Sequence, residues 1–458
     1  MPELYDYQKE GARWLSTKKF ALLADEMGLG KSAQAIVACD ILAANRILVL
    51  CPAVARVNWM REWSKFSRRN LSCSVYFKTI DARTSSSANV TICSYDLASG
   101  KRLNSALSSK PWDVCVLDES HYLKNRRSKR TKAVFETISI RSKHLWALSG
   151  TPAPNHPAEL WPLLHAFSVY GGGYWSFVRR YCTARETPFG TQITGGRNIP
   201  ELRRLIAPIL LRRRKEEVLT QLPAIRFSDV AIEPTEIPDD RLVEDFWPNF
   251  KTFAPERRVQ ALYDDLSEQS RILETLARDI GFLRETSVDI LRGIEHKVKS
   301  LRRWIGIRKT PNIVKMIQAE LEAGAYDKIV VFGVHKDVLM LMRDGLEAYG
   351  SVLIYGGTPA LKRDRIVRRF QEDPDCRVFI GQVIAAGTAI TLTAAHHVAI
   401  VEADWTPANN QQAIMRVHRI GQDKPVLCRF FNLAGSLDEQ IQRVLRRKTK
   451  TLIELFDN

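Results

Sequence analysis

Short runs of apolar residues, bounded by turn residues, alternate with amphipathic stretches along most of the chain. In the first half these runs are FALLA (20–24), RILVLCP (46–52), VTICSYD (90–96), WDVCVLDE (112–119) and HLWALSGTP (144–152). In the second half they are KIVVFGV (328–334), SVLIYGG (351–357), CRVFIGQV (376–383), HVAIVEAD (397–404) and PVLCRFF (425–431). The alternation is typical of β–α–β units with buried parallel strands, so we predict an α/β fold with two parallel-sheet lobes.

Two stretches depart from this alternation. Between Val259 and Ile305 apolar residues recur at spacings of three and four, which predicts long amphipathic helices. Residues 156–222 lack strand-like runs, which indicates a helical protrusion on the first lobe. The predicted domains are a first lobe over 1–231, a linker with the helical region over 232–310, and a second lobe over 311–458.

The chain is strongly basic, with a formal net charge of +17 and a pI of about 9.6. Lys and Arg side chains that neutralise phosphates release counterions, so this charge favours a nucleic acid as partner. A membrane surface is the rival partner, but no apolar run approaches the roughly 20 residues of a spanning helix. The N-terminus lacks the pattern of a signal peptide, so we expect an intracellular protein. The eight cysteines form no CxxC pair, so neither structural zinc nor a disulfide framework is expected.

A glycine-rich turn, DEMGLGKS from Asp25 to Ser32, joins the first apolar run to a helix-like stretch. In such a turn the backbone N–H groups and the helix N-terminus face phosphate oxygens. Lys31 would then reach the terminal phosphates, and the Ser32 hydroxyl would bind magnesium. The general pattern GxxxxGK[ST] is incomplete because Asp25 stands at the first glycine position. Taken alone, the motif fits an ordinary strand–helix turn equally well.

A second motif, Asp118-Glu119-Ser120-His121, follows the apolar run VCVL. Its carboxylates would emerge at the carboxyl end of a strand, where open α/β sheets bind ligands. Asp118 would hold magnesium through water, and Glu119 would orient and polarise the attacking water. The later LSGTP (148–152) could sense the nucleotide beneath the phosphates, although by itself it is a turn.

Near the C-terminus, Arg416 and Arg419 stand three residues apart, on one face if the segment is helical. Such a pair can stabilise the charge that develops on a transferred phosphoryl group, as arginine fingers do. The alternative is a solvated, basic helix end.

Together these motifs resemble those of the Swi/Snf-like ATPases, superfamily-two motors that translocate on duplex DNA. The matching blocks span nearly the whole chain in the family's order, from LYDYQKEGARWL and DEMGLGKS through DESHYLKN and LSGTP to DWTPANNQQAIMRVHRIGQ. The resemblance implies two RecA-like lobes, with Gln8 as the adenine-recognising glutamine, and it makes Asp25 a family feature. The expected nucleotide-binding residues are Gln8, Asp25, Gly28, Leu29, Gly30, Lys31, Ser32 and Gln412, with ATP and Mg2+ as ligands. The expected catalytic residues are Lys31, Asp118, Glu119, Arg416 and Arg419, with Ser32 and Asp118 at the metal.

Within that family, YCTARETPFG, LRRRKEEVLTQLP and RRWIGIRK look most like the annealing-helicase branch. The resemblance implies a monomeric, DNA-dependent ATPase that translocates on duplex or branched DNA and remodels DNA structure or protein–DNA complexes. The alternatives are a strand-separating DNA or RNA helicase and, in another class, a DNA-binding scaffold that has lost hydrolysis. Because no appended module is recognised, we expect a bacterial or phage-infected cytoplasm rather than a eukaryotic nucleus.

A basic run begins a few residues after Glu119 and is well placed to couple DNA contact to hydrolysis. A nuclear localisation signal is the alternative, but the run lies inside a catalytic lobe. Contacts with backbone phosphates carry no base information, so binding should be salt-sensitive and without strong sequence preference. The predicted DNA contacts are Lys124, Asn125, Arg126, Arg127, Lys129, Arg130, Arg213 and Lys309.

Overall fold

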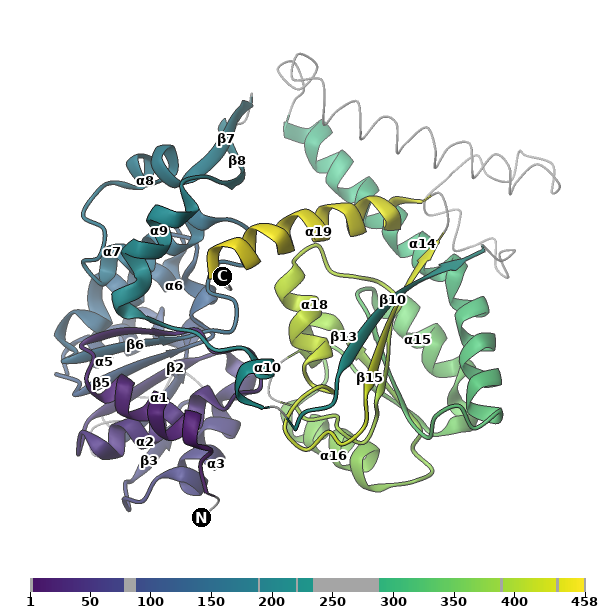
Figure 1. Cartoon of the computed structure of the whole chain (residues 1–458), viewed down its shortest axis with the longest axis horizontal. Helices are drawn as coiled ribbons and strands as arrows, with labels where there is room; N and C mark the ends of the chain where they lie inside the picture. Colours follow the sequence, from purple (N-terminus) through teal and green to yellow (C-terminus); the bar gives the residue numbers. More distant parts are fainter. Residues whose placement is uncertain are drawn as a thin grey trace. The chain divides into compact units, whose positions relative to one another are not determined.

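The computed structural model describes residues 3–77, 88–187, 190–219, 221–233, 288–387, 390–433 and 436–456. The chain divides into two compact units, and each is built around its own parallel sheet (Figure 1). The first unit comprises Met1–Ala184, Ile193–Leu222 and Lys448–Asn458, and the second comprises Arg185–Gln192 and Pro223–Arg447. The predicted α/β fold with two parallel-sheet lobes is therefore confirmed.

The first unit contains a seven-stranded sheet in the order β3-β4-β2-β5-β6-β1-β9. Its strands are β1 (Phe20–Leu23), β2 (Ile47–Cys51), β3 (Cys73–Val75), β4 (Val90–Ser94), β5 (Val114–Asp118), β6 (His144–Leu148) and β9 (Leu210–Leu211). Its helices are α1 (Asp6–Ser16), α2 (Lys31–Ile41), α3 (Arg56–Phe66), α4 (Tyr95–Ala98), α5 (Lys101–Ser108), α6 (Lys129–Lys132), α7 (Trp161–Ala166), α8 (Tyr174–Tyr181), α9 (Ile199–Ile206) and α10 (Lys215–Val218).

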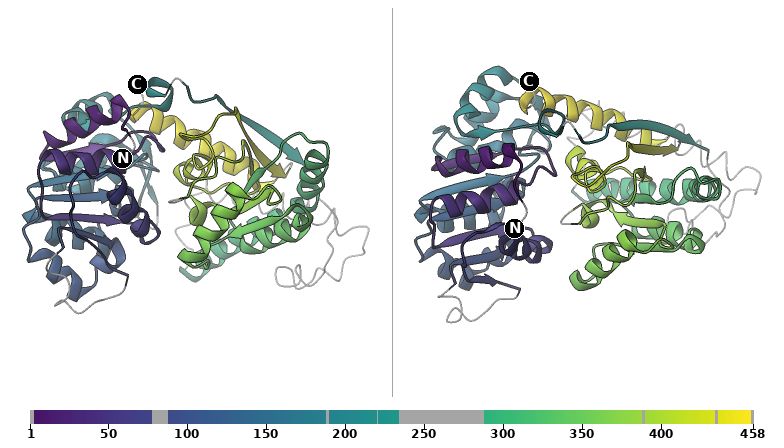
Figure 2. Two further views of the ribbon diagram at one scale, coloured as in Figure 1. Left: turned by 90° about the horizontal axis from the view of Figure 1, so that it is seen from below. Right: turned by 60° about the horizontal axis from the view of Figure 1, so that its bottom comes forward.

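Side chains of the first sheet are buried on both faces, which explains why its strands are nearly continuous apolar runs. In β5, Cys115 and Leu117 join the core on one face, whereas Val114 and Val116 join the core on the other. Helices cover both faces (Figure 2). Burying one such aliphatic side chain contributes roughly 1.5–3 kcal/mol, so the two cores hold the carboxyl edge of the sheet in place.

The second unit contains a six-stranded sheet in the order β10-β15-β14-β11-β13-β12. Its strands are β10 (Ile225–Ile232), β11 (Ile329–Gly333), β12 (Ser351–Ile354), β13 (Val378–Gln382), β14 (His397–Ile400) and β15 (Val426–Leu433). Its helices are α14 (Val288–Glu322), α15 (Lys336–Gly345), α16 (Ala360–Glu372), α17 (Val383–Ala386), α18 (Pro407–Ile414) and α19 (Leu437–Phe456). The part of α19 from Lys448 onward belongs to the first unit.

The division between the units differs from the predicted boundary at residue 231. Strand β10 pairs in parallel with β15 along its whole length, so the second unit already begins at Pro223. At the other end, Leu455 and Phe456 of α19 pack into the core of the first unit, although residues 311–458 were assigned to the second lobe.

The predicted helical regions are found only in part. The protrusion over 156–222 contains α7, α8 and α9, but it also carries a two-stranded sheet of β7 (Cys182–Thr187) and β8 (Gly190–Gly196), which the sequence pattern did not predict. The predicted helices between Val259 and residue 287 lie outside the described residues. No helix within the described ranges is both long enough and apolar enough to cross a membrane.

Candidate active site

The phosphate loop connects the end of β1 to the first turn of α2. Gly28 and Gly30 have φ angles of 90° and 73°, a backbone region that favours glycine. A Cβ atom on Gly30 would also lie 2.4 Å from Nε2 of Gln8. The glycines therefore allow the loop to place the N–H groups at the start of α2 in the arrangement that binds phosphate.

Lys31 is the first residue of α2, and its ammonium group turns back onto the loop. Its Nζ donates to the carbonyl oxygens of Asp25, at 2.6 Å, and Glu26, at 3.2 Å. Burial lowers the pKa of Lys31, while the carboxylates of Glu119 and Asp25 act in the opposite direction. The lysine is thus held beside the phosphate loop by acceptors that a phosphate group can replace.

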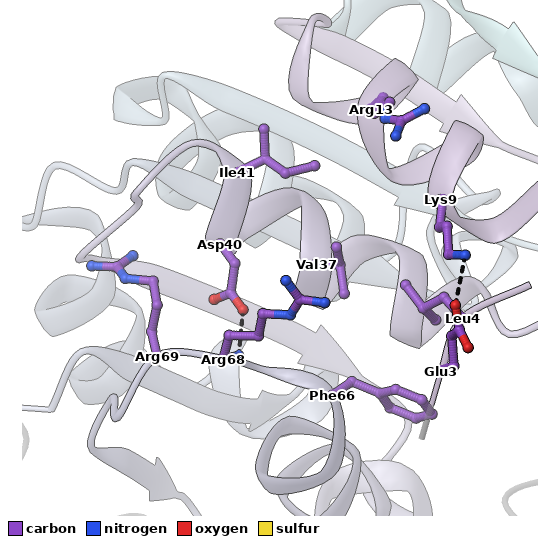
Figure 3. Close-up of a pocket in the computed structure, with 10 residues that line it drawn as sticks. All are labelled: Glu3, Leu4, Lys9, Arg13, Val37, Asp40, Ile41, Phe66, Arg68 and Arg69. Carbon is purple, nitrogen blue, oxygen red and sulfur yellow. Dashed lines mark hydrogen bonds and ion pairs between the residues drawn. The ribbon is translucent and has the colours of Figure 1, made fainter. Parts of the chain in front are cut away.

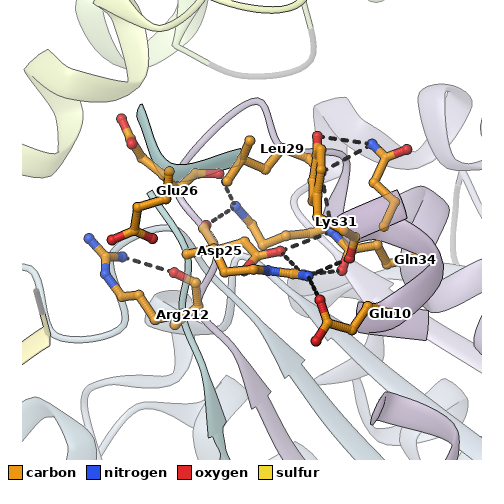
Figure 4. A network of polar contacts seen from close by, with 12 residues as sticks. Glu10, Asp25, Glu26, Leu29, Lys31, Gln34 and Arg212 are labelled. Carbon is orange, nitrogen blue, oxygen red and sulfur yellow. Dashed lines mark hydrogen bonds and ion pairs between the residues drawn. The ribbon is translucent and has the colours of Figure 1, made fainter. Parts of the chain in front are cut away.

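Asp25 anchors the phosphate loop through a buried polar network (Figure 4). Its carboxylate accepts hydrogen bonds from Arg213 Nε at 3.0 Å, from Arg213 Nη2 at 2.6 Å and from Gln34 Nε2 at 2.9 Å. The Asp25 carboxylate, which stands at the first glycine position of the general motif, therefore helps to hold the phosphate loop in place. The prediction that Arg213 contacts DNA is contradicted, because its side chain is only 10% exposed and its donors are engaged inside the unit.

Gln8 lies on α1, with its side chain buried against the phosphate loop. Its Nε2 donates to the Leu29 carbonyl at 3.2 Å, and its Oε1 accepts from the Tyr5 amide at 3.1 Å. A pocket of about 710 Å³ lies nearby, between α1, α2 and the end of α3 (Figure 3). It is lined by Glu3, Leu4, Lys9, Arg13, Val37, Asp40, Ile41, Phe66, Arg68 and Arg69, so it contains none of the phosphate-loop residues.

Asp118 ends β5 at the carboxyl edge of the sheet, as the sequence predicts. Its Oδ2 accepts a hydrogen bond of 2.7 Å from the indole Nε1 of Trp59, a buried residue of α3. Burial and the neighbouring Glu119 carboxylate raise the pKa of Asp118, and the indole hydrogen bond lowers it. Trp59 was not predicted as a site residue, because only its apolar character can be read from the sequence.

Glu119 has a left-handed backbone, with φ of 48°. A residue other than glycine in this region costs of order 1–3 kcal/mol, and such strain is concentrated at functional sites. Its Oε2 lies 3.3 Å from Nδ1 of His121, and the same nitrogen lies 3.2 Å from Oγ of Ser149. The contact between His121 and Ser149 therefore joins the DESH motif to the LSGTP motif, which lie at the ends of the neighbouring strands β5 and β6.

The described residues contain no cluster of three or more His, Cys, Asp or Glu side chains that would hold a metal by themselves. Mg2+ keeps several water ligands and takes further oxygens from substrate phosphates, so it needs few protein ligands, and the Asp118 carboxylate and the Ser32 hydroxyl are the residues that would hold it here. The glycine amides and Lys31 fit the phosphates of a nucleoside triphosphate.

In the second unit, α18 ends at Ile414, so Arg416 and Arg419 lie beyond the helix rather than on one of its faces. Arg416 Nε donates to the Gly387 carbonyl at 2.9 Å, and Arg419 Nη1 donates to the Ile390 carbonyl at 3.2 Å. Gln412 is buried on α18.

Lys309 is the second predicted DNA contact that the structure contradicts. Its ammonium group is buried and bonds to Asp438 Oδ2, at 2.5 Å, and the Phe431 carbonyl, at 2.7 Å. A lysine held in this way fixes α14 to α19 and β15 and cannot reach a DNA phosphate.

The basic run after Glu119 lies on the surface of the first unit, where Asn125, Arg127 and Lys129 are exposed. Lys124 pairs with Glu159 at 3.0 Å, and the Arg126 guanidinium lies 4.4 Å from the centre of the Tyr174 ring. The Arg130 guanidinium lies 5.5 Å from the centre of the Tyr122 ring. These six residues remain candidates for phosphate contact.

Two parallel-sheet units, a phosphate loop and a DExH motif define the class of helicase-like nucleoside triphosphatases. The SNF2-related domain matches residues 7–236, and the helicase conserved C-terminal domain matches residues 312–421. The chain belongs to the SNF2-related family, and the resemblance seen in the sequence is confirmed.

Among its relatives is the human "DNA annealing helicase and endonuclease ZRANB3", 29% identical over 98% of this chain and 40% of that protein. A Xenopus laevis "SWI/SNF-related matrix-associated actin-dependent regulator of chromatin subfamily A-like protein 1" is 29% identical over 98% of this chain and 44% of that protein. The chain thus spans well under half the length of these relatives. A solved "Sulfolobus solfataricus SWI2/SNF2 ATPase core in complex with dsDNA" is 24% identical, with a TM-score of 0.45, covering 100% of this chain and 97% of that one.

The expectation of a bacterial or phage-infected cytoplasm is wrong. The relatives that match 97–98% of the chain come from human, cattle, mouse, Xenopus, Drosophila and Aspergillus, all of them eukaryotes. The expectation rested on the lack of a recognised appended module, a feature that carries no information about the host.

Proposed function

We propose that the protein is a DNA-dependent ATPase that translocates on duplex DNA and thereby remodels DNA structure or protein–DNA complexes. The observation that carries this proposal is that the phosphate loop after β1 and the Asp118–Glu119 motif at the end of β5 lie at the same edge of one parallel sheet, within a member of the SNF2-related family. The human relative, described as a DNA annealing helicase, supports DNA as the nucleic acid.

In this mechanism the first unit binds the nucleotide and prepares the water. The amides of Gly28 to Ser32 and the Lys31 ammonium bind the phosphates, and Gln8 recognises the adenine base. Asp118 and Ser32 hold Mg2+, which when bound neutralises charge developing on the phosphate oxygens. Glu119 accepts a hydrogen bond from the attacking water and aligns it for in-line attack.

The second unit and the basic surface complete the proposal. Arg416 and Arg419 act as arginine fingers on the γ-phosphate, with Gln412 supporting the nucleotide. The six exposed or half-buried residues of the basic run contact backbone phosphates and transmit DNA binding to Glu119 through the short 3-10 helix Ser120–Leu123. They are Lys124, Asn125, Arg126, Arg127, Lys129 and Arg130.

ATP hydrolysis measured with duplex DNA, single-stranded DNA, RNA and no nucleic acid tests this function. We expect the highest rate with duplex DNA, and stimulation that falls steeply as salt rises, because DNA binding releases counterions. Equal rates under all four conditions would reject DNA dependence. Strand separation on forked and blunt duplexes would instead favour the helicase alternative.

Trp59→Phe tests whether the indole hydrogen bond orients Asp118 for the metal. The substitution keeps an aromatic ring in the core but removes the donor to Asp118 Oδ2. Groups that support a metal-binding side chain typically affect metal affinity 10–100-fold, so we expect the Mg2+ concentration for half-maximal hydrolysis to rise about 10-fold. Trp63→Phe, at a second buried tryptophan of the same helix, is the control and should leave the Mg2+ dependence unchanged. An unchanged Mg2+ dependence in Trp59→Phe would exclude this orienting role.

A further inference from the structure

The segment that leaves the first unit runs beside the phosphate loop. Strand β9 pairs in parallel with the end of β1, with Leu211 opposite Leu23. Beyond these strands the two segments remain hydrogen-bonded to each other. The Ala24 amide donates to the Leu211 carbonyl at 2.7 Å, and the Glu26 amide donates to the Arg213 carbonyl at 3.0 Å. Residues 210–215, here called the exit segment, therefore form one side of the loop that carries Lys31.

The Arg213 guanidinium joins the exit segment to three other elements. Besides its two bonds to Asp25, its Nη2 donates to Gln34 Oε1 of α2 at 2.8 Å, and its Nη1 donates to the Tyr7 carbonyl of α1. The space is tight, because a Cβ atom on Gly11 would lie 2.6 Å from Arg213 Nη2. A planar group with five donors fits this set of acceptors, whereas a lysine ammonium cannot bond to all of them.

The network continues from Arg213 to the groups that face the nucleotide. Gln34 Nε2, held by the same carboxylate, also donates to the Leu29 carbonyl at 3.1 Å. The Asp25 carbonyl accepts the Lys31 ammonium at 2.6 Å. One residue earlier, Arg212 Nη1 donates to the Ala24 carbonyl at 2.8 Å and to the Gly150 carbonyl of the LSGTP motif at 3.0 Å. The exit segment thus contacts both the phosphate loop and the motif behind it.

We propose that Arg213 is a positioning residue of the ATP site, through which the exit segment fixes the nucleotide-binding conformation of the phosphate loop. The inference rests on the proposed function only in taking ATP as the ligand of this loop. The ion pair between Arg213 and Asp25 is buried, and such pairs are weak evidence for stability because desolvation offsets their attraction. The geometric specificity of a bidentate arginine–carboxylate pair explains the presence of an arginine here better than a gain in stability does.

Arg213→Lys in the full chain tests the proposal, because the substitution keeps the positive charge and loses the bidentate geometry. The affinity for a fluorescent ATP analogue with Mg2+ is measured without DNA. We expect a dissociation constant and a KM for ATP about 10-fold or more above wild type, since misplacing binding groups by about 1 Å can cost 100-fold. Arg180→Lys is the matched control, because Arg180 pairs with Glu201 at 2.6 Å on the surface with 57% exposure, and its affinity should stay within about twofold.

Hydrogen–deuterium exchange gives a second readout that a general loss of stability would not produce. In the wild type, the Mg2+-bound analogue should protect amides of the exit segment as well as those of the phosphate loop, and Arg213→Lys should lose the protection of the exit segment. A folded Arg213→Lys protein with wild-type affinity and protection overturns the inference. Nucleotide affinity is measured without DNA, so a failure of DNA stimulation rejects the proposed function and leaves this test of Arg213 intact.

Discussion

Glu119→Gln should bind Mg2+-ATP with nearly wild-type affinity and fail to hydrolyse it. The amide keeps the size of the carboxylate, so the left-handed turn at residue 119 and the phosphate loop should be preserved. An amide does not accept the proton of the attacking water as a carboxylate does. General base catalysis contributes about 100- to 10,000-fold, so kcat should fall within that range.

The measurement compares single-turnover hydrolysis with equilibrium binding of the nucleotide. Glu136→Gln, at an exposed glutamate of the same unit, is the control and should hydrolyse ATP at the wild-type rate. Substantial hydrolysis by Glu119→Gln would show that another group orients the water, and loss of nucleotide binding would show that Glu119 has a structural role instead.

The strands of both sheets could be predicted where they are buried on both faces, because such strands are continuous apolar runs. The strands that the sequence did not predict lack such a continuous apolar run. β9 has two residues, which is too short for any pattern. β10 lies at the edge of its sheet and mixes apolar with polar residues, with Phe227 57% exposed, so no continuous apolar run marks it as a strand. Residues up to 231 were therefore predicted in the first lobe, although β10 pairs with β15 of the second unit.

The positions of the candidate site residues in the fold were predictable as far as these residues belong to motifs placed at the ends of strands. Asp118 ends strand β5, and Lys31 and Ser149 follow strands β1 and β6 of the same parallel sheet, whose carboxyl ends lie at one edge. Trp59 and Arg213 were missed as supporting residues because their roles depend on partners far away in the sequence. Arg213 and Asp25 are 188 residues apart, and a run of three arginines looks basic and exposed until its partner is known.

Burial also decides which basic residues can contact DNA. Arg213 and Lys309 have the charge expected of a DNA contact, but each is enclosed with a carboxylate partner. Net charge alone therefore overestimates the basic surface, and exposure in the folded chain separates Arg127 and Lys129 from the two buried residues.

Replacing either arginine of the C-terminal motif should have the largest effect on kcat. Arginine fingers contribute about 1,000- to 100,000-fold to phosphoryl transfer, so Arg416→Ala and Arg419→Ala should each lower kcat by at least about 1,000-fold. Affinities for DNA and for ATP should change little, because the charge that the guanidinium neutralises develops mainly in the transition state.

Each arginine also bonds to a backbone carbonyl, so a structural role must be separated from a catalytic one. Arg377→Ala is the matched control: Arg377 lies in the same unit, and its guanidinium donates to the Asp327 carbonyl at 2.9 Å and the Leu321 carbonyl at 3.2 Å. Loss of such bonds should lower the melting temperature in all three variants, but kcat should collapse only in Arg416→Ala and Arg419→Ala. Equal falls in kcat for all three would mean that the motif acts through the fold of the second unit, because only a finger needs its charge at the γ-phosphate.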